Sequence, residues 1–76
     1  MSRLPVLSGA DAVRAFERAG WAVARQRGSH VVLTKPGRSA NLSVPQHRQL
    51  DPGTPRGLIH DSGLSVSAFA ILLKDR

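Results

Sequence analysis

Two clusters of turn-forming residues divide the middle of this 76-residue chain into three short extended segments. The clusters are Gly28-Ser29 and residues 36–39, which read Pro-Gly-Arg-Ser. Residues 21–26, 30–35 and 41–44 alternate or run apolar over the length of an ordinary strand. Short connections of this kind join antiparallel neighbours. The pattern therefore predicts three antiparallel strands in the middle of the chain.

A helix is predicted before the strands. Ser8 followed three residues later by Asp11 is typical of a helix start, in which the two residues cap each other. Val13 and Phe16 recur at helical spacing after it, and Gly20 is placed to end the helix. We expect Phe16, like Trp21 and Phe69, to belong to the core.

Two helices are predicted after the strands. Thr54 is placed to cap the first of them, with Pro55 at its first helical position and Gly63 at its end. Ser65 is placed to cap the second, whose apolar residues are Val66, Phe69, Ala70, Leu72 and Leu73. The predicted fold class is α+β, in the order helix, three-stranded antiparallel sheet, helices. A chain of this length is one domain, residues 1–76.

Alternation along the second hairpin predicts the two faces of the sheet. With the turn near Gly37 and Arg38, we expect Leu33 to face Val44. The face under the helices is predicted to carry Val31, Leu33, Leu42 and Val44. The open face is predicted to carry His30, Val32, Thr34, Ser43 and His47. In this register His30 and His47 are cross-strand neighbours, with Cβ atoms about 5 Å apart.

Positive charge is concentrated in the same region. The chain has 11 Lys and Arg against 5 Asp and Glu, a net charge of +6. No acidic residue lies between Glu17 and Asp51, and this interval holds Arg18, Arg25, Arg27, Lys35, Arg38 and Arg48. A field of one sign attracts a polyanion, so we expect a nucleic acid as partner. The alternative is a basic interaction domain whose partner is an acidic protein.

The absence of cysteine excludes disulfides and thiolate metal sites, which fits a reducing compartment. Residues 1–7 lack the apolar stretch of a signal peptide, and no apolar run approaches the roughly 20 residues that cross a bilayer. We therefore expect a cytoplasmic protein with no membrane partner.

His30 combines with the nearby arginines to suggest chemistry on a phosphodiester. Imidazole takes and gives protons near neutral pH, and guanidinium binds phosphate through two parallel hydrogen bonds. The five acidic residues are scattered, whereas a two-metal nuclease clusters them. We expect His30 to be catalytic and expect no metal and no cofactor. The residues expected to bind the nucleic acid are Arg25, Arg27, Ser29, Lys35 and His47.

Each of these residues also has a purely structural interpretation. His30 can hydrogen-bond to a loop at the start of its strand, and His47 can shape the turn after Pro45. Arg25 and Arg27 can form a solvated strand edge. Ser29 can serve only the turn. Lys35, at the hairpin tip, can act on a polyanion at long range alone.

Five short segments occur in a fixed order along nearly the whole chain, from about residue 8 to residue 73. They are Gly20-Trp21, residues 25–30 (RQRGSH), Val44-Pro45-x-His47, Gly53-Thr54 and Gly63-Leu64-Ser65. This series resembles the HicA-type mRNA interferase toxins of bacterial toxin–antitoxin pairs. The resemblance implies a fold like a double-stranded-RNA-binding domain, a catalytic histidine in the Gly-Ser-His segment, cleavage of mRNA in the bacterial cytoplasm, and a neutralising HicB-type antitoxin.

The leading hypothesis is therefore a single HicA-like RNase domain, a metal-independent endoribonuclease toxin that uses His30. The alternative is a non-catalytic RNA-binding module of the same fold, because a basic sheet binds RNA through shape and backbone without a titratable ring. The Gly28-Ser29-His30 turn favours the enzyme over the module.

Overall fold

The computed structural model describes residues 6–74, so most of the segment considered as a signal peptide lies outside the described residues. The elements follow one another along the chain as α1 (Gly9–Arg18), β1 (Ala22–Arg27), β2 (His30–Thr34), β3 (Leu42–Pro45), α2 (Gly53–Ser62) and α3 (Val66–Lys74). The strands form one antiparallel sheet in the order β1-β2-β3. This arrangement confirms the predicted α+β fold class.

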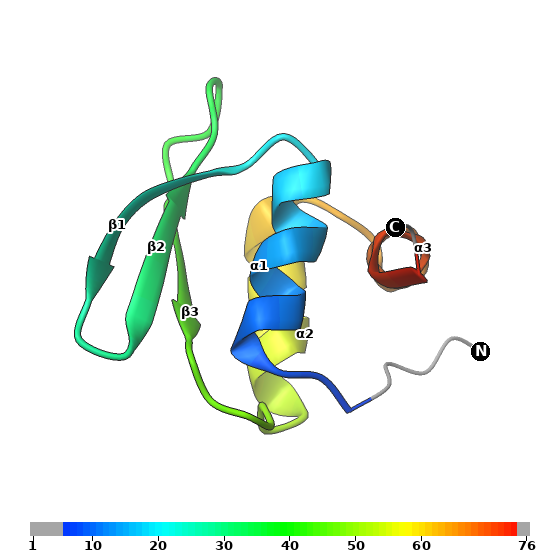
Figure 1. The fold of residues 1–76 in the computed structure, drawn as a ribbon. Helices are drawn as coiled ribbons and strands as arrows, with labels where there is room; N and C mark the ends of the chain where they lie inside the picture. The colour runs from blue at the N-terminus through cyan, green and yellow to red at the C-terminus, as the bar shows by residue number, and fades with distance from the viewer. Residues whose placement is uncertain (1–5, 75–76) are drawn as a thin grey trace.

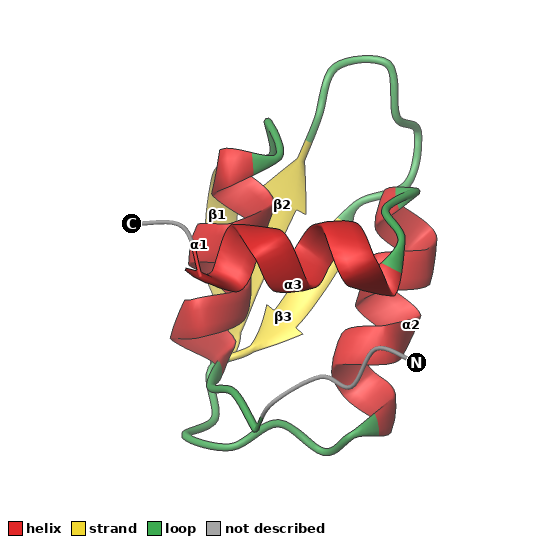
Figure 2. Cartoon of the chain, turned by 90° about the vertical axis from the view of Figure 1, so that its right-hand side faces the viewer, coloured by secondary structure: helices red, strands yellow, loops and turns green. Residues whose placement is uncertain are grey.

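The elements form three layers. The sheet lies on one side of α1 and α2, and α3 lies on their other side (Figure 1). Turned by 90°, the molecule shows α3 crossing over α1 and α2 (Figure 2). Phe16 of α1 and Phe69 of α3 pack with ring centroids 4.9 Å apart, and both are fully buried. Because α1 and α2 cover only one face of the sheet, the opposite face, called the open face here, is available to a ligand.

The start of α1 has the predicted capping geometry. The Ser8 hydroxyl oxygen accepts a hydrogen bond from the Asp11 backbone N–H at 3.1 Å, and the Asp11 carboxylate accepts one from the Ser8 N–H at 3.2 Å. This backbone hydrogen bond from Ser8 is the main reason that the pKa of Asp11 lies below its ordinary value. At the other end, Gly20 has φ +98°, as expected of a glycine that follows a helix.

The second half of the chain differs from the prediction at one helix start. Thr54 does not cap α2, because the helix already begins at Gly53 and Pro52 occupies the capping position without a side-chain hydrogen bond. Pro52 has φ −55° and ψ −33°, and its ring holds φ at a value suited to a first helical turn. Gly63 ends α2 with φ +83°, and the Ser65 hydroxyl caps α3 by accepting from the Ala68 N–H, both as predicted.

The register of the second hairpin also differs from the prediction. Leu33 faces Leu42 instead of Val44, a shift of two residues. Because side chains alternate with a period of two, this shift preserves the faces. The four predicted core residues of the sheet, Val31, Leu33, Leu42 and Val44, are all buried. The predicted pairing of His30 with His47 is wrong, since His30 faces Pro45.

Val32 is the exception on the open face, because only 7% of its surface is exposed. It lies on the central strand between Arg25 of β1 and Ser43 of β3. Side chains on flanking strands screen a short central one, and an arginine stem covers apolar surface while its charge stays in water. The burial of Val32 therefore agrees with its place on the open face.

Two helical glycines give opposite expectations for stability. A Cβ at Gly9 would overlap the carbonyl oxygen of Pro45, whereas a Cβ at Gly57 would meet nothing within 4 Å. We expect Gly9→Ala to lower the free energy of unfolding by about 1–3 kcal/mol through overpacking. Gly57→Ala should raise it by about 1 kcal/mol through helix propensity. Chemical denaturation of both variants tests this. A Gly9→Ala protein as stable as wild type would contradict the close approach of α1 to residues 45–46.

Candidate nucleic-acid interface

The open face carries two rows of side chains that run across the sheet. One row contains Arg27 of β1, His30 of β2 and Pro45 of β3, which are paired in the two ladders. The next row contains Arg25, Val32 and Ser43, paired in the same way. Residues that face one another in a ladder lie on the same side of the sheet. The register therefore places Arg25, Arg27 and His30 on one surface.

A bulge in β1 produces this arrangement. Val23 faces Leu33 and Arg25 faces Val32, so Ala24 is an extra residue between the two pairs. In a regular strand, Val23, Arg25 and Arg27 would lie on one face. The extra residue instead leaves Val23 on the side of buried Leu33 and turns both arginines to the open face. Bulges commonly redirect side chains in this way beside functional sites.

His30 is the first residue of β2 and is exposed. Its ring makes no hydrogen bond to another residue in the described range 6–74. Arg27 lies directly opposite it across the Gly28-Ser29 turn, and Cβ atoms in such pairs are about 5 Å apart. The imidazole and one guanidinium can therefore contact the same phosphate group.

The Gly28-Ser29 turn is held in place from both sides. Gly28 has φ +59°, a conformation that a side chain resists, and its carbonyl oxygen accepts a hydrogen bond from the Gln26 side chain at 3.2 Å. The Ser29 carbonyl accepts from the Gln46 N–H at 2.6 Å, which ties the turn to the end of β3. Ser29, the second residue of this turn, is exposed. A fixed turn fixes the position of His30.

His47 lies just beyond β3, one residue after Gln46, and is exposed. Its carbonyl oxygen accepts a hydrogen bond from the Gly9 N–H at 2.9 Å, which joins the end of the sheet to the start of α1. Because Gln46 pairs with Ser29, His47 lies at the same end of the sheet as His30. The two histidines share that end without facing each other in the ladder.

Three cations of the basic stretch are bound to the carboxyl ends of helices. Lys35 Nζ donates to the Ala19 carbonyl after α1 at 2.9 Å, and Arg38 donates to the Asp61 carbonyl in α2 at 2.8 Å. Arg18 donates to the Leu72 carbonyl in α3 at 2.6 Å. Cations at these ends satisfy free carbonyls and oppose the helix dipole. Lys35 also lies at the opposite end of β2 from His30, so the structure does not bring these two residues together.

The other three cations of the stretch remain exposed. Arg25, Arg27 and Arg48 have no ion pair or hydrogen bond with another residue in the described part of the chain. Asp11, in contrast, is paired with Arg14. Arg48 was not among the predicted site residues, although its place in the stretch without acids, next to His47, was a sequence signal for it. The free positive charge therefore gathers near the two histidines.

The described residues contain no group of three His, Cys, Asp or Glu that could hold a metal ion. No helix among them is long and apolar enough to cross a membrane.

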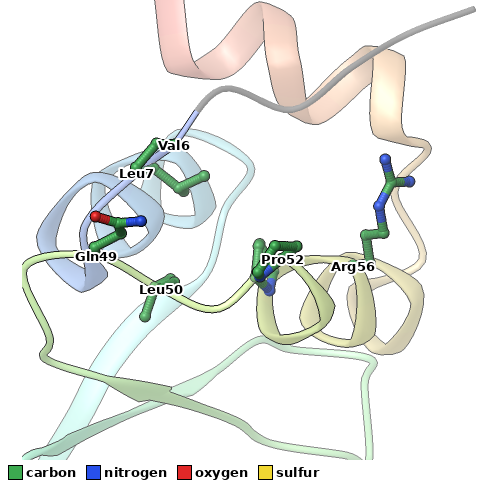
Figure 3. Close-up of a pocket in the computed structure, with 7 residues that line it drawn as sticks. Val6, Leu7, Gln49, Leu50, Pro52 and Arg56 are labelled. Carbon is green, nitrogen blue, oxygen red and sulfur yellow. The ribbon is translucent and has the colours of Figure 1, made fainter.

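A cavity of about 110 Å³ lies between residues 6–7, the loop after β3 and the start of α2 (Figure 3). It is lined by Val6, Leu7, Gln49, Leu50, Pro52, Pro55 and Arg56, none of which belongs to the open face. The candidate interface is thus a surface of the sheet, which suits a chain-like ligand.

A family model described as the HicA toxin of bacterial toxin–antitoxin systems matches residues 9–64. The match begins at the first residue of α1 and ends just after α2. It contains the whole sheet and every candidate site residue. No curated protein matches the chain significantly.

Proposed function

Because the chain belongs to the HicA toxin family of bacterial toxin–antitoxin systems, we propose that it is a metal-independent endoribonuclease with His30 as its catalytic residue. The observation that supports the proposal most strongly is that His30 is exposed on the open face with Arg27 directly opposite it. Membership in the family makes the chain a toxin and implies an antitoxin as its partner. RNA as substrate and the role of His30 are the proposed steps beyond this.

The proposed reaction uses the nucleophile that RNA itself carries. The 2′-oxygen attacks the adjacent phosphorus and gives up its proton, and the bond from phosphorus to the 5′-oxygen breaks as that oxygen gains a proton. The products are a 2′,3′-cyclic phosphate and a 5′-hydroxyl. His30 carries one of the two proton transfers, as base when neutral or as acid when protonated. Arg27 stabilises the charge that develops on the phosphate oxygens.

We expect the purified toxin to cleave RNA at the same rate with and without excess EDTA. The reason is that a histidine and an arginine supply the proton transfer and the charge stabilisation that a two-metal site would otherwise provide. Gel analysis of a labelled RNA measures the rate. Loss of cleavage in EDTA, with recovery in magnesium or manganese, would contradict the metal-independent mechanism. A folded protein that binds RNA and never cuts it would favour the non-catalytic module.

We further propose that a HicB-type antitoxin silences the toxin by covering the open face with an acidic surface. Arg25 and Arg27 are exposed on the open face, and Arg48 is exposed in the loop after β3; none of the three has an acidic partner among the described residues. An acidic surface placed over them would neutralise the charge and close the path of RNA to His30. The antitoxin and RNA would then compete for one surface.

Charge reversal tests the antitoxin surface. We expect Arg25→Glu to slow association with the antitoxin by about tenfold or more at low salt and to weaken its salt dependence, because complementary charge chiefly sets the association rate. Arg56→Glu makes the same change of charge on α2, which lies on the other side of the sheet, and should have little effect. Surface plasmon resonance at several salt concentrations measures both. Equal effects of the two variants would place the antitoxin elsewhere.

A further inference from the structure

The open face holds its two free arginines of β1 at a defined separation. Arg25 and Arg27 are two residues apart in the same strand, past the bulge, and lie on the same face. Two residues of a strand span about 6.6 Å. This length is comparable to the separation of neighbouring phosphorus atoms along an RNA strand. The two arginines can therefore bind consecutive phosphates of one strand.

The row of Arg25 has its own polar partner. Ser43 is exposed on β3, and its hydroxyl makes no hydrogen bond within the described part of the chain. Arg25 and Ser43 flank Val32, which is nearly buried and offers no competing polar group. The Cα atoms of Arg25 and Ser43 are about 10 Å apart across two strand spacings. A long guanidinium chain and a hydroxyl can both reach a phosphate that rests on Val32.

No further cation follows Arg25 on this face of β1 and β2. The next pair on the open face is Ala22 and Thr34, beyond the Val23–Leu33 pair of the opposite face, and it carries no cation. On the other side of the Arg25 row lies the row of Arg27 and His30, where the proposed cleavage takes place. The arrangement therefore has a scissile position and one neighbouring position, and the neighbour lies on a fixed side of the scissile one.

From this geometry we infer that the toxin binds two consecutive phosphates of a single RNA strand. The scissile phosphate lies between Arg27 and His30, and the phosphate next to it lies in a second site formed by Arg25 and Ser43. This inference rests on the proposed endoribonuclease function. It deepens that function by defining the substrate as an RNA strand laid along β1, with one uncut phosphate that the enzyme requires in ionised form.

The test uses a short RNA with one mapped cut site and a neutral methylphosphonate on either side of that site. In the wild type, neutralising one of the two neighbours should lower kcat/KM by about 10- to 100-fold, the effect of losing a hydrogen bond to a charged group. Neutralising the other neighbour should have little effect. Arg25→Gln should lower kcat/KM on the unmodified RNA to about the level that the wild type shows on the neutralised RNA, and neutralising that phosphate should lower it no further. Ser43→Ala should be less sensitive than the wild type to the same neutral linkage.

A double variant with unchanged net charge distinguishes a local phosphate site at Arg25 from long-range attraction by the positive charge of the protein. In the double variant Arg25→Gln with Gln26→Arg, the guanidinium moves to the face of Val31, which lies under the helices, and the net charge is unchanged. The swap should behave like Arg25→Gln alone. Gln26→Ala controls for the lost hydrogen bond to Gly28 and should retain the full sensitivity. If the swap keeps the sensitivity of the wild type, long-range charge explains it and the second site is wrong.

Binding gives an independent measurement. The same oligonucleotides with a 2′-deoxy sugar at the cut site should bind without being cleaved, and the neutral linkage should weaken binding in the wild type but not in Arg25→Gln. If both proteins respond equally to the neutral linkage while the wild type still cleaves RNA, the second site fails and the proposed function stands. If the wild type neither binds nor cleaves RNA, the proposed function itself fails.

Discussion

Replacing His30 by alanine should lower the rate of RNA cleavage by about 10²–10⁴-fold, the usual contribution of general acid–base catalysis. The same variant should no longer inhibit growth when it is expressed. Its thermal unfolding should match that of the wild type, because His30 is exposed and its ring has no hydrogen-bond partner among the described residues. Cleavage assays and circular dichroism on the purified variant measure the two effects separately.

His60→Ala is the matched control for this experiment. The side chain of His60 is 91% exposed on α2, away from the open face, and we expect this variant to cleave at the wild-type rate. A folded His30→Ala protein that still cleaves at that rate would overturn the catalytic assignment. A His30→Ala protein that unfolds would show instead that the residue has a structural role.

The affinity for RNA should depend on Arg27 more than on His30. Phosphate contacts supply most of the affinity in nucleic-acid complexes, so His30→Ala should change the dissociation constant only slightly. Removing Arg27 eliminates a phosphate contact and should weaken binding and reduce its salt dependence. The pair of variants thereby distinguishes a group that moves protons from one that holds the substrate.

The faces of the sheet could be predicted from the sequence, but the pairing across it could not. Alternation of apolar residues identified Val31, Leu33, Leu42 and Val44 as buried. The observed loop places Leu33 against Leu42, two residues from the predicted pairing. Because a shift of two leaves every side chain on its face, the core carries no signal that distinguishes the two registers. Only the loop decides, and its residues allow more than one turn.

The candidate site shows the same limit. The bulge at Ala24 decides on which face Arg25 and Arg27 lie, and a single extra alanine in an exposed edge strand has no sequence signature. The basic stretch likewise did not reveal that Lys35 and Arg38 bind helix ends, since their partners lie 16 and 23 residues away in the chain. Such contacts depend on how the helices pack, which local patterns do not describe.

A single 2′-deoxy sugar at the cut site should abolish cleavage at that position more completely than any protein variant. The reason is that it removes the proposed nucleophile, whereas His30→Ala removes only a group that assists it. The products of the unsubstituted RNA should end in a 2′,3′-cyclic phosphate and a 5′-hydroxyl, which mass spectrometry of the fragments identifies. The substituted RNA should still bind, because its phosphates are unchanged.

DNA extends this argument. A single-stranded DNA is flexible and carries a similar spacing of charges, so it should compete for the open face and inhibit cleavage of RNA without being cut itself. Discrimination between the two nucleic acids would then arise in the chemical step and not in binding. Cleavage that survives the 2′-deoxy substitution and leaves a 5′-phosphate would mean that water is the nucleophile. In that case His30 would have to activate the water, and Arg27 would keep the same role at the phosphate.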